Sequence, residues 1–260
     1  MADASPGTSK MTLNDPFAEL AGTSRLPLEV VESGSLTPHM QRLRLTAPQL
    51  AGFGYAPGQD VMLLVDVEGN RPVRRRYTIR ALDTASQTLT LDVVLHGDGP
   101  GERWVRAARP GDKIEGIGPR GKITTAEGAD WHLFAGDEAA LPAIFAMAES
   151  LPAGTPVRVL LEIPGPEDEQ DLNAKASTHI TWLHRGGGRA GEPDALAAAA
   201  GQVPFPAGHG HAYLLGEARV ESRLREGLAA RGLQPDQVSP KAYWGRGRAN
   251  ASHGEPARDA

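Results

Sequence analysis

The first half of the chain consists of short apolar runs separated by Gly, Pro and Asp, and none of these runs is long enough for a buried helix. Runs of this length between turn residues are typical of β-strands. We therefore expect an all-β region from about residue 25 to residue 123. Six strands in about a hundred residues favour a small barrel. The expected strands are residues 28–32, 40–46, 60–67, 76–82, 88–95 and 113–117.

The pattern changes at residues 124–130, a polar stretch that we interpret as a linker. Beyond it, apolar strands alternate with alanine-rich helical segments, which predicts a parallel sheet with helices on its faces. The expected strands are residues 131–135, 157–163, 179–184, 212–215 and 241–244, and the expected helices are residues 139–150, 193–200 and 217–230. The predicted fold class is a β barrel plus an α/β domain. Its parts are a flexible leader (1–24), a barrel domain (25–125), an α/β domain (126–250) and a tail (251–260).

Composition narrows the chemistry. The 260 residues include no cysteine and carry a formal net charge of -5. Without thiols there is no disulfide framework, no Cys-ligated zinc or iron–sulfur cluster and no cysteine nucleophile, so redox chemistry needs a bound organic cofactor. The acidic balance gives no general attraction to nucleic acid or anionic lipid. The amino-terminal residues have no apolar run that would serve as a secretory signal or membrane anchor, so we expect a cytoplasmic location.

Residues 74–80 form the most informative polar segment. On a strand, the two-residue period places Arg75 and Tyr77 on one face and Arg76 and Thr78 on the other. A guanidinium pairs with phosphate, a phenol lies against a flat heterocycle and a threonine hydroxyl hydrogen-bonds a ring nitrogen. A flavin dinucleotide needs these three groups. A solvated edge strand that carries a run of charges is the alternative interpretation.

A glycine-rich turn, His96 to Gly101, follows the next expected strand, and Pro100 lies near the start of a short helix that we expect to run through Ala108. Glycines allow close backbone approach, and a helix start presents unpaired N–H groups to a pyrophosphate. The turn is therefore a candidate anion site. A plain tight turn is the alternative.

These segments and five later motifs occur in the order found in the siderophore-interacting protein family, which the chain resembles from about residue 25 to 248. The later motifs are residues 118–121 (Gly-Pro-Arg-Gly), 135–143, 181–185, 216–217 and 243–247 (Tyr-Trp-x-Arg-Gly). The family belongs to the ferredoxin-reductase-like superfamily. The resemblance implies a six-stranded Greek-key FAD-binding barrel at the N-terminus and a Rossmann-like NAD(P)-binding domain at the C-terminus.

The resemblance also implies residue roles. Arg75 would meet the FAD pyrophosphate, Tyr77 would pack on the isoalloxazine and Thr78 would lie near N5, so Tyr77 and Thr78 are the predicted catalytic residues. Residues 136–138 follow the first strand of the α/β half, in the crevice where nucleotides bind. A core role for Trp244 stays open. The other predicted cofactor-binding residues are Arg76, Val94, Leu95, His96, Gly99, Pro100, Gly101, Trp104, Gly136, Asp137, Glu138 and Trp244.

Two positions depart from the family's pattern. The family commonly has Gly-Pro-Ala-Ser before the Trp, whereas residues 99–102 read Gly-Pro-Gly-Glu. A carboxylate in place of a phosphate-binding hydroxyl predicts weaker FAD retention, unless Glu102 points away and Arg103 compensates. Ala139 replaces a usual Thr, which removes a phosphate or ribose contact and predicts weaker binding of a pyridine nucleotide.

The implied function is that of an FAD-dependent ferric-siderophore reductase, which passes electrons from NADH or NADPH through the flavin to chelated Fe(III) and releases Fe(II). The alternatives are a general NAD(P)H flavin reductase and a siderophore-binding protein without turnover. Glu162 favours NADH, whereas Arg158 and Arg185 are candidates for a 2′-phosphate, so the nicotinamide preference stays open. A ferredoxin is a further candidate donor, and we expect a monomer.

Ferric catecholate chelates are anionic, so a protein of net negative charge needs a local basic rim to bind them. Arg120 and Lys122 follow the last barrel strand, and Arg246 and Arg248 follow the last strand of the other half. These four residues are the predicted substrate-binding residues, with ordinary surface cations as the alternative for Lys122 and Arg248. We expect no protein-ligated metal, because in this family iron arrives within its chelator.

Overall fold

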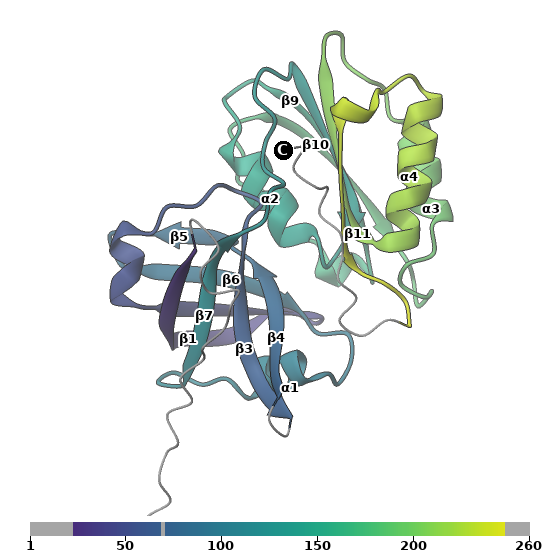
Figure 1. The fold of residues 1–260 in the computed structure, drawn as a ribbon. Helices are drawn as coiled ribbons and strands as arrows, with labels where there is room; N and C mark the ends of the chain where they lie inside the picture. The colour runs from purple at the N-terminus through teal and green to yellow at the C-terminus, as the bar shows by residue number, and fades with distance from the viewer. Residues whose placement is uncertain (1–22, 69–70, 248–260) are drawn as a thin grey trace, which may run out of the picture.

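The computed structural model describes residues 23–68 and 71–247 of the chain. These residues form two sheets, an antiparallel one in the N-terminal half and a parallel one in the C-terminal half (Figure 1). The predicted tail, Arg248 and nearly all of the predicted leader lie outside the described residues.

The antiparallel sheet has the strand order β4-β3-β7-β1-β2-β6-β5. Strand β4 also contacts β6, so the sheet curls into a half barrel around a core of leucines such as Leu43, Leu63 and Leu91. The short helix α1 (Pro100–Ala107) packs against β2, β3 and β4. A 3-10 turn, η1, covers Pro48–Gly52. The strands are β1 (Ser24–Thr37), β2 (Met40–Thr46), β3 (Asp60–Glu68), β4 (Arg71–Thr78), β5 (Ala81–Asp83), β6 (Thr88–Val94) and β7 (Lys113–Arg120).

The sheet contains seven strands where six were predicted, because the predicted strand 76–82 is wrong. Strand β4 begins at Arg71 and ends at Thr78, and β5 is a separate strand that pairs with β6. Between them Ile79 donates its N–H to Gln59 and Arg80 donates its N–H to Thr90, so the chain leaves β3 and crosses to β6 at this point. The expected helix after Pro100 is confirmed as α1.

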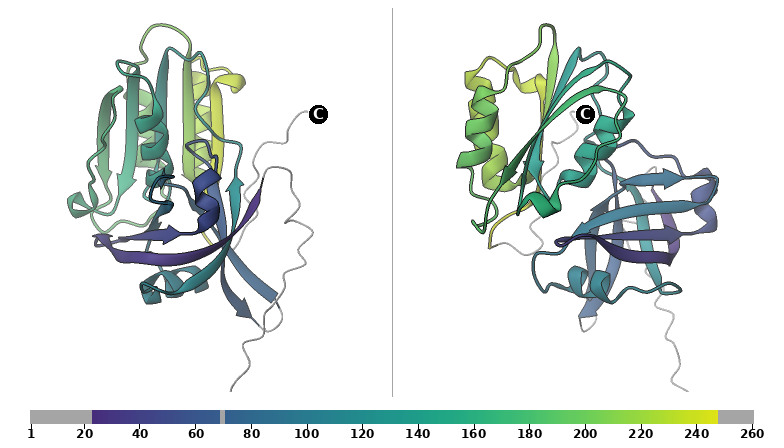
Figure 2. Two further views of the ribbon diagram at one scale, coloured as in Figure 1. Left: turned by 90° about the vertical axis from the view of Figure 1, so that its left-hand side faces the viewer. Right: turned by 180° about the vertical axis from the view of Figure 1, so that it is seen from behind.

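The parallel sheet has the order β10-β9-β8-β11-β12, as the alternation of strands and helices predicted. Helix α2 covers the face toward the barrel, and α3 and α4 cover the opposite face (Figures 1 and 2). Two 3-10 turns, η2 (Pro166–Asp168) and η3 (Pro235–Gln237), lie between elements. The strands are β8 (Trp131–Asp137), β9 (Pro156–Ile163), β10 (Ser177–His184), β11 (Gly210–Glu217) and β12 (Val238–Trp244), and the helices are α2 (Leu141–Ser150), α3 (Asp194–Gln202) and α4 (Ala218–Ala230).

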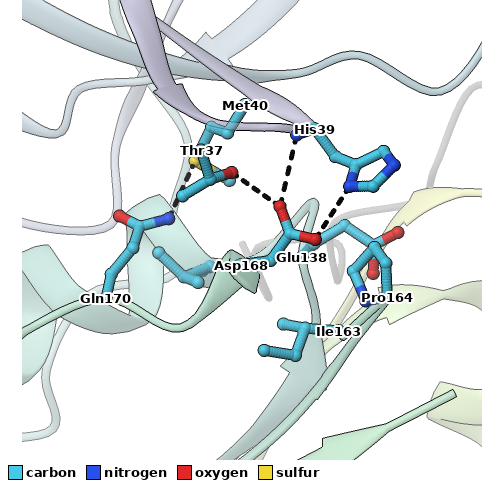
Figure 3. A pocket seen from close by; sticks show the side chains of 9 residues that line it. Thr37, His39, Met40, Glu138, Ile163, Pro164, Asp168 and Gln170 are labelled. Carbon is cyan, nitrogen blue, oxygen red and sulfur yellow. Dashed lines mark hydrogen bonds and ion pairs between the residues drawn. The ribbon is translucent and has the colours of Figure 1, made fainter. Parts of the chain in front are cut away.

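Polar contacts and apolar packing join the two halves. Asp168, whose side chain is buried, accepts hydrogen bonds from the Thr37 hydroxyl at 2.7 Å and from the His39 main chain at 3.2 Å, and it lies 2.8 Å from His39 Nδ1 (Figure 3). Arg80 pairs with Glu149 through two hydrogen bonds of 2.6 and 2.7 Å. The cavity beside Asp168 measures about 10 Å³, which is about the space of one water. The barrel is thus fixed against helix α2 and against the turn η2 that follows β9.

Candidate functional site

Strand β4 and the start of α1 bring together three of the predicted cofactor residues. A Cβ at Gly101 would lie 2.6 Å from Tyr77 Oη and 2.9 Å from Arg75 Cγ, so only glycine lets α1 lie this close to β4. Burial raises the pKa of the Tyr77 phenol, and the Arg75 guanidinium opposes that shift. Arg75, Tyr77 and Gly101 therefore form a cradle in which an aromatic plate and a cation adjoin a helix start.

The opposite face of β4 contacts the α/β half. Arg76 makes a bidentate ion pair with Asp60 of β3, with hydrogen bonds of 2.9 and 2.5 Å. Lys241 of β12 reaches the same carboxylate at 3.3 Å. Thr78 hydrogen-bonds Tyr243 of β12, whose phenol pKa is raised by burial. Arg76 and Thr78 thus lie in a polar junction between the domains.

Sequence reasoning missed Asp60 and Lys241, which are 181 residues apart and show no local signal. Tyr243 lay within a motif of the resemblance, which was the available signal for it. Arg76 and Lys241 share this one carboxylate across the junction.

The glycine-rich turn is organised around Glu102. The Glu102 carboxylate accepts hydrogen bonds from the main-chain N–H groups of His96 and Gly97, both at 2.5 Å, and from that of Gly99 at 3.4 Å. Glu102 therefore points into the turn and not away from it. Weaker retention of FAD stays the prediction. Arg103 donates to the Asp98 carbonyl at 2.7 Å, away from that carboxylate.

The remaining predicted residues of this region lie around the turn. Val94 ends β6, and Leu95 donates its N–H to the His39 carbonyl at 2.8 Å. Pro100 occupies the first turn of α1, and Trp104 packs on the barrel core.

The predicted nucleotide-binding residues lie at the carboxyl end of β8 and are buried. A Cβ at Gly136 would lie 2.3 Å from the Leu215 carbonyl oxygen, so this glycine is needed for packing. Asp137 accepts hydrogen bonds from the Trp244 indole at 2.8 Å and from the main chain of Ala139 and Glu217 at 2.9 and 3.0 Å. Burial and the neighbouring Glu138 raise the Asp137 pKa to about 7.

Trp244 links this edge to the barrel. Its indole is held by Asp137, and its ring system meets the His96 ring edge-on at 6.3 Å. The two predicted cofactor regions, the glycine-rich turn and the edge of β8, are thus adjacent through one aromatic side chain.

The charges at the next strand ends are paired. Arg185 makes two hydrogen bonds of 2.6 Å with Glu138 and lies 3.5 Å from Glu162. Burial raises the Glu162 pKa, and Arg185 opposes that shift. Arg158 lies near the start of β9, at the end of the sheet opposite to the nucleotide crevice. Neither arginine that was considered for a 2′-phosphate is therefore placed to receive one without rearrangement.

The predicted substrate cations are placed differently from one another. Arg120 ends β7 opposite Asp60, and its buried Nη1 has no hydrogen-bond partner among the described residues. Lys122 is exposed. Arg246 pairs with Glu192 at 2.8 Å and donates to the Ala190 carbonyl at 2.5 Å, so its charge is already neutralised.

A half barrel with an Arg-x-Tyr-Thr strand, followed by a parallel α/β domain, is the fold that the resemblance to a family of flavoproteins implies. Two family models match the chain: the siderophore-interacting FAD-binding domain over residues 64–123 and the siderophore-interacting protein over residues 129–247. The chain belongs to the siderophore-interacting protein family, which confirms the resemblance. Its FAD-binding domain confirms the flavin prediction.

Three relatives illustrate the family. Ferric vibriobactin reductase ViuB from Vibrio cholerae is 32% identical over 88% of this chain and 92% of its own length. The NADPH-dependent ferric-chelate reductase of Escherichia coli is 30% identical over 68% of each chain. The crystal structure of a siderophore utilization protein from T. fusca is 33% identical, covers 90% of this chain and 98% of that chain, and superposes with a TM-score of 0.81. Both named enzymes are oxidoreductases that act on ferric chelates.

The residues of the cradle fit FAD. A stacked heterocycle needs an aromatic plate, which Tyr77 offers, and a phosphate needs a fork of donors, which Arg75 offers. The glycine at position 101 keeps the space between them clear of a Cβ. Within the described ranges, no helix has the length and apolar character needed to cross a membrane.

Proposed function

We propose that this protein is an FAD-dependent ferric-siderophore reductase that takes electrons from a reduced nicotinamide and delivers them to chelated Fe(III). The observation that carries the proposal is the cradle of Arg75, Tyr77 and Gly101 within a siderophore-interacting FAD-binding domain. The names of two relatives, a ferric vibriobactin reductase and an NADPH-dependent ferric-chelate reductase, support the same reaction class.

FAD, when bound, supplies a carrier that accepts two electrons together and releases them one at a time, as a one-electron acceptor such as Fe(III) requires. Arg75 would bind phosphate, and Tyr77 would support one face of the ring system. Thr78 would be the hydroxyl nearest the reacting part of the ring, and Tyr243 fixes its orientation from the other domain. Trp244, held by Asp137, would exclude water from the junction between the domains.

The substrate side of the proposal rests on cations at the junction. Arg120 has a buried guanidinium nitrogen with no hydrogen-bond partner in the described part of the chain, and it lies in the same cross-strand row as Asp60. Asp60 in turn binds Arg76 and Lys241, so three cationic side chains lie around this row. An anionic ferric chelate would be attracted to this group of cations. Arg246 would join the site only after release from Glu192, while Lys122 and Arg248 stay predictions.

The electron donor proposed from the structure is NADH. Glu162 lies at the end of the second strand, and Arg185 is held by Glu138 and is therefore withdrawn from a 2′-phosphate. A reduced ferredoxin as donor, a monomeric state and a cytoplasmic location stay predictions from the sequence.

The experiment is anaerobic and has two steps. The protein is loaded with FAD and mixed with NADH or NADPH while the flavin absorbance is followed, and the reduced protein is then mixed with a panel of ferric chelates. We expect NADH to bleach the flavin and a ferric catecholate to restore its absorbance. A protein that takes up no FAD, or whose reduced flavin is not reoxidised by any ferric chelate, contradicts the proposal.

A matched pair of variants tests the substrate side. Arg120→Gln should slow reoxidation by an anionic ferric chelate about tenfold and leave reoxidation by a neutral dye unchanged, because it removes a cation that faces the junction. Lys113→Gln removes the same charge from the exposed start of the same strand and should change neither rate. Equal effects of the two variants would show that only the overall charge matters.

A further inference from the structure

Glu102 occupies a place in the flavin domain that favours an anion. It lies in the first turn of α1, where the helix dipole and unpaired N–H groups attract negative charge. Three main-chain N–H groups, those of His96, Gly97 and Gly99, converge on its carboxylate. His96 Nδ1 lies a further 3.3 Å from the same carboxylate.

The carboxylate is held tightly. The Glu102 side chain is only 11% exposed, and a Cβ at Gly97 would lie 3.1 Å from one of its oxygens. The turn therefore closes around Glu102 as it would around a bound phosphate. The Glu102 carboxylate thus accepts hydrogen bonds from main-chain N–H groups that a glycine-rich turn before a helix otherwise offers to a ligand.

Glu102 also adjoins the cradle along the chain. Gly101 precedes Glu102 directly, and a Cβ at Gly101 would lie 2.9 Å from Arg75 Cγ. Burial is the main reason that the pKa of the Tyr77 phenol is raised, and the charges of both Arg75 and Glu102 act on the same phenol, Arg75 lowering its pKa and Glu102 raising it. A phosphate bound by Arg75 would therefore have a fixed negative charge nearby, and like charges repel.

We propose that Glu102 is an internal substitute for a flavin phosphate, and that it sets the flavin specificity of this protein. The turn donors are occupied by Glu102, so the FAD pyrophosphate gains contact with Arg75 alone and is opposed by the neighbouring carboxylate. The isoalloxazine then supplies most of the binding, and the flavin exchanges with the solution instead of staying resident. The inference rests on the proposed function, in that it requires a flavin at the cradle.

The unmodified protein gives the first test. Dissociation constants for FAD, FMN and riboflavin are measured by quenching of flavin fluorescence. Riboflavin has the same ring system and no phosphate, so the ratio of its constant to that of FAD reports what the phosphates and the adenosine contribute. We expect FAD to bind no more than about tenfold more tightly than riboflavin. A ratio of about a thousandfold would overturn the inference, since it would show that the phosphates are well bound.

A neutral variant gives the second test. Glu102→Gln retains a side-chain oxygen that can accept the turn N–H groups and removes only the charge. We expect it to bind FAD about tenfold more tightly than the unmodified protein and riboflavin with unchanged affinity. The control is Glu115→Gln, which removes one negative charge from an exposed position on β7 and should change neither constant. Unchanged or weaker FAD binding by Glu102→Gln overturns the inference, as does an equal gain for riboflavin.

The two proposals fail in different ways. If the unmodified protein binds FAD far more tightly than riboflavin and reduces ferric chelates, the proposed function stands and the role of Glu102 is wrong. If neither the unmodified protein nor Glu102→Gln binds any of the three flavins, the proposed function falls and the inference falls with it.

Discussion

The shared carboxylate of Asp60 predicts how the free energy of unfolding changes when either side of the buried ion pair is removed. Asp60 and Lys241 have side chains only 3% and 4% exposed, and they join the barrel to β12 at 3.3 Å. Arg76 binds the same carboxylate from a side chain that is 36% exposed. Asp60→Asn leaves the ammonium of Lys241 buried without its carboxylate. Breaking a buried pair from one side in this way costs about 3 kcal/mol.

The reverse change is milder. Lys241→Met leaves Asp60 with both hydrogen bonds from Arg76 and fills a similar volume, so we expect a cost of about 1 kcal/mol. The double variant Asp60→Asn with Lys241→Met removes both buried charges. It should therefore be about 2 kcal/mol more stable than Asp60→Asn alone, because the ammonium that has lost this carboxylate is no longer buried.

The assay is thermal unfolding followed by circular dichroism and tryptophan fluorescence. For a chain of this size about 1 kcal/mol corresponds to a shift in Tm of roughly 2–4 °C, so Asp60→Asn should lower the Tm by roughly 6–12 °C. The second substitution should restore roughly 4–8 °C. A double variant no more stable than Asp60→Asn would contradict this assignment, because the cost would then lie in the lost hydrogen bonds of Arg76 instead of the buried charge.

Three further predictions follow from single side chains. Arg75→Lys should weaken FAD binding about tenfold, measured by fluorescence quenching, because a lysine cannot hold a phosphate bidentately; unchanged affinity would remove Arg75 from the site. NADH should reduce the flavin at least about tenfold faster than NADPH at equal concentration, because Arg185 is held by Glu138 and is withdrawn from a 2′-phosphate. Glu138→Gln should narrow that difference in rate. A preference for NADPH would contradict this prediction. Burial lowers the His211 pKa to about 4, so the unfolded chain binds a proton that the folded chain does not, and stability should fall by up to about 3 kcal/mol as the pH drops from about 6.5 to about 4. His211→Gln should flatten this part of the pH profile, and an unchanged profile would assign the loss to other groups.

The architecture was open to prediction because it depends on short-range patterns. Apolar runs between turn residues gave the barrel, and the alternation of strands and alanine-rich helices gave the parallel sheet. The sequence pattern did not predict the break between β4 and β5, because the residues across Ile79 and Arg80 continue to alternate. At this point the chain changes its hydrogen-bonding partner from β3 to β6. Periodicity reports the face of a strand and contains no information about its neighbour.

The sequence predicted which residue types form the candidate site, but not which of their side chains pair with one another. The alternation along β4 separated Arg75 and Tyr77 from Arg76 and Thr78, as the structure shows. The direction of Glu102 and the pairing of Arg246 with Glu192 depend on side-chain rotamers and on loops that meet only after folding. Lys241 carried no signal, because a buried lysine is expected only where a distant carboxylate receives it.

The central claim is electron transfer from a nicotinamide through flavin to chelated iron, and its most direct measurement is the yield of Fe(II). FAD-loaded protein is given a limiting amount of NADH under anaerobic conditions together with an excess of a ferric catecholate and a ferrous-specific chromogenic chelator. We expect about two ferrous ions for each NADH consumed, because one hydride carries two electrons and each iron accepts one. We expect no Fe(II) above background when FAD is left out. Fe(II) formation at the same rate without flavin, or NADH oxidation that yields no Fe(II), would contradict the claim.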